Sequence, residues 1–156
     1  MKTVSVELTI SDVRLMIERL EHNLVIALHR KENFRYVYCG DDIDDYRRQH
    51  KMNLDNINWL TDITLILNNV LHDNIRDLLY DIHDGSHIPG DQHIIHTQMK
   101  YADIVKISEY LDAYVKYMKS NDLLNRLIDS YEEHRYHTYA VKRCEEISQK
   151  LKDQLA

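Results

Sequence analysis

Helix-breaking residues are concentrated in one stretch of this chain, residues 81–96. The stretch holds the only proline, Pro89, and two of the three glycines, Gly85 and Gly90. On both sides of it the apolar residues recur at spacings of three and four, which is the period of an amphipathic helix. We therefore predict a mainly α-helical chain with one clear interruption, a Gly/Pro/His-rich break at residues 83–96.

Four long helices account for the periodic segments. The first begins at an N-cap offered by Ser11 and Asp12 and continues to about Arg30. The others cover about residues 54–82, 97–118 and the segment from a turn at 120–122 to the C terminus. In the third helix, the predicted buried seam consists of Ile104, Ile107, Leu111, Tyr114 and Met118. Short connections between long helices favour antiparallel neighbours, so we expect an all-α architecture resembling a four-helix bundle.

A short β accessory is expected at the N terminus. Val4, Val6 and Leu8 alternate with polar residues, which is the two-residue period of a half-buried strand. Residues 34–38 also alternate and could pair with this strand, but two strands alone are only marginally stable. A symmetry-related copy could complete such a sheet. We favour an irregular structure for residues 34–38.

Four aspartates lie close together within residues 41–45. Their spacing lacks the alternating oxygen ligands, central glycine and distal glutamate of a calcium loop. Carboxylates are favourable at the positive N-terminal end of a helix. We therefore predict that these aspartates open a helix.

The composition is that of a globular chain with one domain. Of the 156 residues, 44% are hydrophobic and 29% are charged, and this length is close to the commonest domain size. The net charge of −6, with scattered lysine and arginine, argues against nucleic acid as a direct ligand. No apolar run is long enough to cross a membrane. We expect a single helical domain over residues 1–156 and no membrane partner.

The two cysteines, Cys39 and Cys144, are far apart in the sequence. They make neither a disulfide framework nor a zinc motif, and they fit reduced thiols. The N-terminal segment has no apolar signal region. These features predict a soluble protein of the cytoplasm.

The break concentrates imidazoles and carboxylates, which are ligands that zinc, iron and manganese accept. The candidate metal ligands are His83, His87, His93, His96, Asp84 and Asp91. Residues three or four apart converge only if the backbone is helical, and Gly85, Pro89 and Gly90 fall between these ligands. We favour a solvated surface loop and expect no cofactor. The alternative is a divalent metal at this loop in a metal-dependent hydrolase.

A second enzymatic alternative involves Arg76, Asp77 and His83. This arrangement resembles the Arg-polar…His signature of HEPN-type ribonucleases, and the resemblance covers only these few residues. HEPN-type ribonucleases are helical bundles and usually dimers. The resemblance implies RNA cleavage by acid-base chemistry at Arg76 and His83, which lie seven residues apart and hence on one helix face.

Tyrosine dominates the aromatic residues, with eleven tyrosines against one phenylalanine and one tryptophan. A tyrosine ring has an apolar body and a polar hydroxyl, which suits a helix face that is part core and part interface. A position at the rim of the core is the simpler role for these rings. The candidate recognition surface consists of Tyr110, Tyr117, Tyr136 and Tyr139.

The sequence contains no Gly-rich phosphate loop, nucleophile elbow or Cys-His arrangement. We therefore favour a non-enzymatic function, in which a small helical protein binds another protein and regulates or inhibits it, in the form of a homodimer. The bias toward Asn, Asp, Ile, Lys and Tyr suits an accessory protein of a phage or other mobile element.

Overall fold

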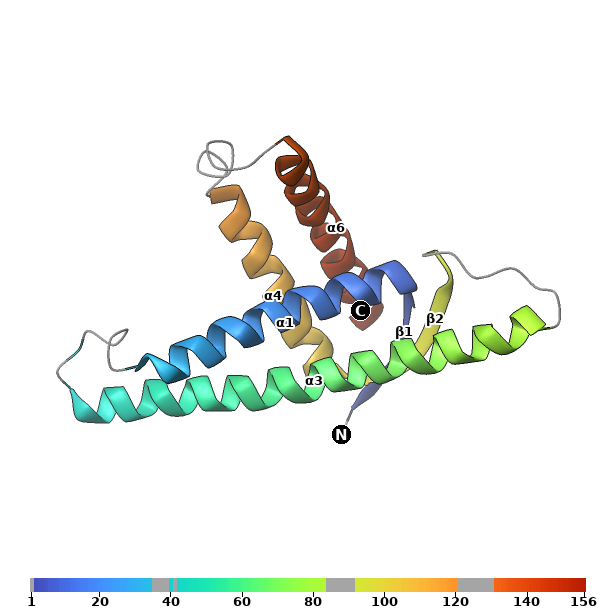
Figure 1. Ribbon diagram of the computed structural model, residues 1–156. Coiled ribbons are helices and arrows are strands. Elements are labelled where there is room, and N and C mark those ends of the chain that lie inside the picture. Colours follow the sequence, from blue (N-terminus) through green and yellow to red (C-terminus); the bar gives the residue numbers. More distant parts are fainter. Residues whose placement is uncertain (1, 35–39, 41, 84–91, 121–130) are drawn as a thin grey trace. The chain divides into compact units, whose positions relative to one another are not determined.

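The fold is mostly helical, with one small sheet (Figure 1). The computed structural model describes residues 2–34, 40, 42–83, 92–120 and 131–156, and only the helical backbone for residues 77–83 and 131–137. Its elements are β1 (Thr3–Thr9), α1 (Ile10–Glu32), α3 (Ile43–His83), β2 (Ile94–Lys100), α4 (Tyr101–Ser120) and α6 (Tyr131–Leu155). The predicted all-α fold with a short N-terminal β accessory is confirmed.

Contacts between residues divide the chain into two compact units. The first unit contains residues 1–16 and 71–156, and hence the sheet together with α4 and α6. The second unit contains residues 17–70, which form most of α1 and the larger part of α3. Both α1 and α3 therefore contribute residues to each unit.

The first unit is built around a two-stranded antiparallel sheet. β1 pairs with β2 in a register that places Thr3 opposite Lys100 and Thr9 opposite Ile94. The buried hydrophobic residues of the sheet are Val6, Leu8, Ile95 and Met99. One face of the sheet therefore contributes to the core, as the alternation in β1 predicts.

β2 corrects the prediction for residues 97–100. The third predicted helix begins at Tyr101 rather than at residue 97, because residues 94–100 pair with β1. Ile95 and Met99 are buried and Thr97 between them is half-buried, so the inward residues follow the two-residue period of a strand. The alternative prediction was a strand at residues 34–38. Phe34 is helical, and residues 35–38 lie outside the described part of the chain.

α4 and α6 lie side by side in the first unit (Figure 1). α6 packs against β1, and α4 packs against β2. Asp112 of α4 accepts hydrogen bonds from Ser148 and Lys152 of α6, both at 2.6 Å. Further along α4, Lys119 pairs with Glu145, which comes earlier in α6. The two helices are therefore antiparallel.

The buried faces of these helices agree in part with the prediction. Buried residues of the pair are Ile104, Ile107, Ser108, Leu111, Val115, Ala140, Cys144, Ile147, Ser148 and Leu151. The predicted seam of α4 is wrong at its C-terminal end, because Val115 is buried while Tyr114 and Met118 are only half-buried. A turn was predicted at residues 120–122. Ser120 is the last residue of α4, and residues 121 and 122 lie outside the described part of the chain.

The second unit is a helical hairpin formed by residues 17–32 of α1 and 43–70 of α3 (Figure 1). Its buried hydrophobic residues are Ile17, Leu20, Ala27, Phe34, Leu60, Ile63 and Leu67. The buried Asn53 side chain donates from Nδ2 to the Ala27 carbonyl at 3.0 Å, which links the two helices. Near their connection, the ring of Phe34 lies 4.8 Å from that of Tyr46 and 5.0 Å from that of His50.

The beginning of α3 confirms the role predicted for Asp42, Asp44 and Asp45, whereas Asp41 lies outside the described residues. Asp42 Oδ1 accepts the backbone N–H of Asp44 at 2.9 Å, so Asp42 acts as the N-cap. Asp44 and Asp45 lie in the first turn of the helix. α3 then continues without interruption through the periodic segment at 54–82.

Candidate functional site

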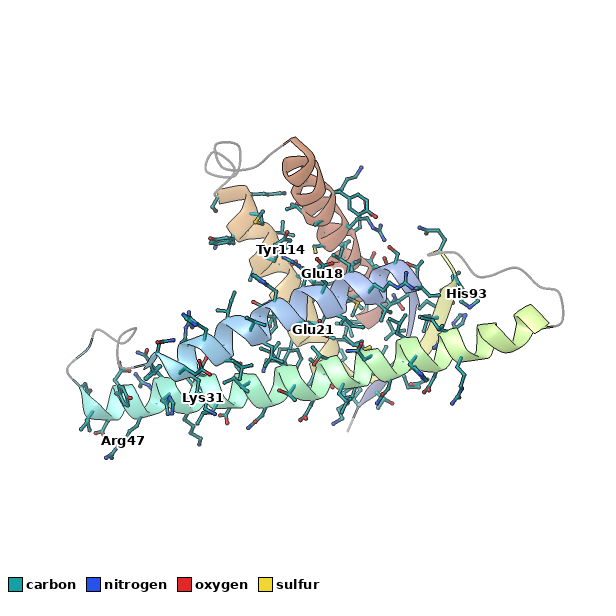
Figure 2. The ribbon with its side chains drawn as sticks, in the orientation of Figure 1. Glu18, Glu21, Lys31, Arg47, His93 and Tyr114 are labelled. Carbon is teal, nitrogen blue, oxygen red and sulfur yellow. The ribbon has the colours of Figure 1, made fainter. Side chains whose placement is uncertain are left out.

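Two of the six candidate metal ligands have described side chains. His93 lies immediately before β2 and is half-buried (Figure 2), and His96 is exposed on β2 with Nδ1 3.3 Å from Glu7 Oε1. The backbone is extended here, so residues three apart point to opposite faces. The side chains of His83, Asp84, His87 and Asp91 lie outside the described residues. Among those that are described, no group of three or more His, Cys, Asp or Glu could hold a metal.

Of the two residues proposed for HEPN-like chemistry, only Arg76 has a described side chain. Arg76 is exposed on α3, with its guanidinium 4.0 Å from Asp73 Oδ1 one turn earlier. His83 is the last residue of α3, and its side chain lies outside the described part. The helical backbone is continuous between the two residues, and their catalytic role stays a prediction.

The four candidate tyrosines occupy different environments. Tyr117 and Tyr139 are exposed, with 66% and 56% of their surface accessible. Tyr110 is half-buried, and this burial raises the pKa of its hydroxyl. Tyr110 and Tyr117 are seven residues apart and therefore lie on the same side of α4. The side chain of Tyr136 lies outside the described residues, and Tyr139 belongs to α6.

A reciprocal cap fixes the beginning of α1. The helix begins at Ile10 with Thr9 as its N-cap, so the N-cap predicted at Ser11 and Asp12 is wrong. Thr9 Oγ1 accepts the N–H of Asp12 at 3.1 Å, and Asp12 Oδ2 accepts the N–H of Thr9 at 3.0 Å. This arrangement is a capping box, in which Asp12 bonds back to the cap from the third helical position.

Asp12 is fully buried and also binds two cations of α6. Arg143 bonds its Oδ1, and Lys150 Nζ lies 2.7 Å from its Oδ2. Burial alone raises the pKa of Asp12, but hydrogen bonds from Lys150 and the Thr9 N–H, with the charges of Lys150 and Arg143, outweigh burial and hold this pKa below its usual range. Asp12 therefore stays ionised at neutral pH and links the beginning of α1 to α6.

The lowered pKa of Asp12 predicts acid sensitivity. A carboxyl whose pKa is lower in the folded chain than in the unfolded chain stabilises the fold above its unfolded pKa, and this stabilisation is lost as the pH falls. We expect the melting temperature to decline between about pH 5 and pH 2, and to decline less steeply in Asp12→Asn. Thermal unfolding followed by circular dichroism measures both. The exposed Asp62→Asn variant serves as control and should follow the wild-type curve; equal slopes for all three chains would contradict the prediction.

Hydrogen bonds at the two ends of the sheet show which backbone groups face the partner strand. The N–H of Ile10 donates to the His93 carbonyl, and that of Tyr101 donates to the Lys2 carbonyl, both at 3.0 Å. Opposite residues of antiparallel strands alternate between bonded and non-bonded pairs. The even-numbered residues of β1 and the odd-numbered residues of β2 therefore face each other, and the remaining residues direct their backbone groups to the outer edges.

The outer edge of β1 is closed at Glu7 and Thr9 by side chains of its own unit. Gln154 of α6 accepts the N–H of Glu7 at 2.6 Å and donates to the Glu7 carbonyl at 3.1 Å. The side-chain amide thus takes the place of a neighbouring strand. At Thr9, the outward N–H is bound by Asp12.

The outer edge of β2 is open. Its outward backbone groups belong to Ile94, His96, Gln98 and Lys100, and none of these groups makes a hydrogen bond in the described part of the chain. All four residues are exposed. Unpaired N–H and C=O groups along a strand are a template for another strand.

In the second unit, α3 carries an exposed apolar stripe. Met52 and Ile66 are 60% and 41% exposed, and Trp59 between them is half-buried. The three residues are seven apart and therefore lie along one side of the helix. We call them the α3 stripe. They lie beside the buried row of α3 at residues 60, 63 and 67.

A groove of about 280 Å³ adjoins the N-terminal end of the α3 stripe. It is lined by Arg30, Phe34, Gln49, Met52, Asn53 and Asn56. Phe34 and Met52 provide apolar surface, and Arg30 is exposed and forms no ion pair within the described part of the chain. Lys31 and Arg47 lie at the same end of the hairpin (Figure 2). The groove suits an apolar side chain that is accompanied by a carboxylate.

Three of these features were not predicted from the sequence. The spacing of Thr9 and Asp12 is a signal for the capping box, and the seven-residue spacing of the α3 stripe was also readable. No local signal identifies Arg143, Lys150 and Gln154, because their partners are 131 to 147 residues away in the sequence.

Comparison with protein-family models, with curated proteins and with solved structures found no match. No helix in the described ranges is both long and apolar enough to cross a membrane. The surfaces of the two units are therefore the basis for a functional proposal.

Proposed function

We propose that this chain is a helical protein-binding module that regulates or inhibits a protein target without catalysing a reaction. It acts in the cytoplasm, in the manner of an accessory protein of a phage or other mobile element. The observation that supports binding is the α3 stripe, in which large apolar side chains remain exposed at the spacing of a helix-helix contact.

The groove beside Met52 indicates the chemistry of the partner. A stripe with seven-residue spacing accepts the apolar face of an amphipathic helix. Arg30, which forms no ion pair with the described residues, lines the groove, and Lys31 and Arg47 lie at the same end of the hairpin, so these cations favour acidic residues beside that face. We therefore infer that the target presents an acidic amphipathic helix.

Substitution of the α3 stripe tests this function. In Ile66→Glu, a carboxylate replaces an apolar contact and repels the acidic helix, so we expect affinity for the target to fall about tenfold or more. Stability should change by less than about 1 kcal/mol, because Ile66 is 41% exposed. The target is first isolated by affinity capture on the wild-type chain and identified by mass spectrometry, and binding of the purified target is then measured by calorimetry.

The adjacent residue provides a matched control. Leu65 is 61% exposed, and it points about 100° away from Ile66 around the same helix. Leu65→Glu introduces the same charge outside the α3 stripe and should bind the target like the wild type. If Ile66→Glu binds normally, or if both variants lose binding equally, the α3 stripe is not the binding surface.

A further inference from the structure

The open edge of β2 supports an inference that does not depend on the target of the α3 stripe. Gln154 and Asp12 close the outer edge of β1 at Glu7 and Thr9, whereas the outward backbone groups of β2 have no partner in the part of the chain that the structure describes. Natural proteins usually block exposed edges, and an isolated two-stranded sheet is marginally stable. The geometry points to a second copy of this chain on that edge, with two β2 strands pairing in an antiparallel, four-stranded sheet.

The register of this pairing follows from the outward residues. β2 spans residues 94–100 and is centred on Thr97. A two-fold axis at Thr97 places His96 opposite Gln98 of the second copy, and Ile94 opposite Lys100 of the second copy. All four outward residues of each strand then form bonded pairs, each of which exchanges two hydrogen bonds.

This register also matches the side chains on both faces of the sheet. On the inner face, Ile95 lies beside Met99 of the second copy, and the two Thr97 residues meet on the axis, which extends the apolar face. On the outer face, the side chains of Glu7 and His96 from one copy line up across the four strands with those of Gln98 and Ser5 from the second copy. The two-fold axis generates a second, equivalent row. Contacts within one chain already join Glu7 to His96 and Gln98 to Ser5. The dimer would therefore continue an existing polar row.

The neighbouring symmetric registers are less favourable. An axis at His96 places the two His96 residues opposite each other and leaves Lys100 without a partner in the strand. An axis at Gln98 places Lys100 opposite His96 of the second copy. Like charges directly opposite each other destabilise a sheet when histidine is protonated. The axis at Thr97 avoids both juxtapositions, and this charge pattern favours a second copy in that register.

Sedimentation analysis of the full chain tests the dimer. Gln98→Pro removes one outward N–H without removing a bond between β1 and β2, and proline is tolerated on an edge strand. Because the dimer is two-fold symmetric, the substitution removes two hydrogen bonds between the copies. We therefore expect self-association to weaken on the order of thirtyfold. The matched control is Gln98→Ala, which also loses the side-chain contact with Ser5 but keeps the N–H. It should dimerise like the wild type.

A cysteine at the two-fold axis tests the register. Opposite residues of a non-bonded antiparallel pair have Cα atoms about 4.5 Å apart, which a disulfide can span. Thr97→Cys should therefore form a covalent dimer under mild oxidation. Thr3→Cys, on the far strand of the sheet, should form no more covalent dimer than the wild type with its native cysteines.

Hydrogen exchange gives a third reading that does not depend on substitution. Amides of His96, Gln98 and Lys100 should be protected in the wild type and should lose protection on dilution to monomer. A wild-type chain that is monomeric at all concentrations would overturn the inference. A dimer that Gln98→Pro leaves unchanged, or one in which Thr97→Cys does not cross-link, would show that the copies meet elsewhere and would overturn it equally. A failure here leaves the Ile66→Glu result unaffected.

Discussion

Asp12→Ala is expected to lower the free energy of unfolding by about 3 kcal/mol, or the melting temperature by roughly 6–12 °C. The substitution removes the capping box at the beginning of α1, which accounts for about 1 kcal/mol. It also leaves Arg143 and Lys150 without the buried carboxylate that they share. Their side chains remain 23% and 42% exposed, so water partly compensates and the loss stays at the lower end of the range for a broken buried ion pair.

Asp112→Ala provides the matched comparison. Asp112 also accepts hydrogen bonds from a lysine of α6, but its side chain is 47% exposed. Solvent screening limits such a pair to less than about 1 kcal/mol. Chemical denaturation of both variants measures the difference. If Asp12→Ala and Asp112→Ala cost the same, burial does not strengthen the cluster around Asp12, and its structural role would have to be abandoned.

The periodicity of the sequence was sufficient to predict the helices. Spacings of three and four show which face of a helix is turned away from water, and they identified α1, α3, α4 and α6. In α4 they also identified the buried residues Ile104, Ile107 and Leu111. The exception in α4 is instructive. Tyr114 continued the heptad seam, yet Val115 is buried and Tyr114 is only half-buried. A heptad pattern gives the spacing of a buried face, but one residue of drift around the helix moves its edge.

β2 was missed for a different reason. Ile94 and Ile95 are adjacent, and His96 follows them, so the segment fits the end of the break or the beginning of a helix as well as a strand. The strand is determined by its pairing with β1, whose partner residues lie 85 to 97 positions earlier in the sequence. The same limit applies to the site residues. The capping box of Thr9 and Asp12 is local and readable, whereas the approach of Arg143 and Lys150 depends on the tertiary fold.

The candidate surfaces were predicted less completely than the fold. Tyr117 and Tyr139 are exposed, as a recognition surface requires, but exposure alone does not identify a partner. The seven-residue spacing of the α3 stripe is visible in the sequence, but periodicity alone does not show which apolar residues of α3 remain exposed. Only the structure separates the residues that close the hairpin from those that remain exposed.

Leu111→Ala is expected to destabilise the first unit by about 3 kcal/mol. Leu111 is fully buried on α4, and it is one of the largest completely buried side chains in the described part of the chain. Removal of a buried leucine costs the transfer free energy of the lost atoms and leaves a cavity that the surrounding side chains fill only partly. Chemical denaturation followed by circular dichroism measures the loss.

Tyr117→Ala on the same helix is the control that connects stability to function. Tyr117 is 66% exposed, so its removal should change stability by less than about 0.5 kcal/mol. A large loss in Tyr117→Ala would show that this ring is covered by another part of the chain, and it could then no longer serve as a recognition residue. If stability is unchanged, the same variant can be used in the target-binding measurement, where a fall in affinity would show that Tyr117 also contributes to binding of the target.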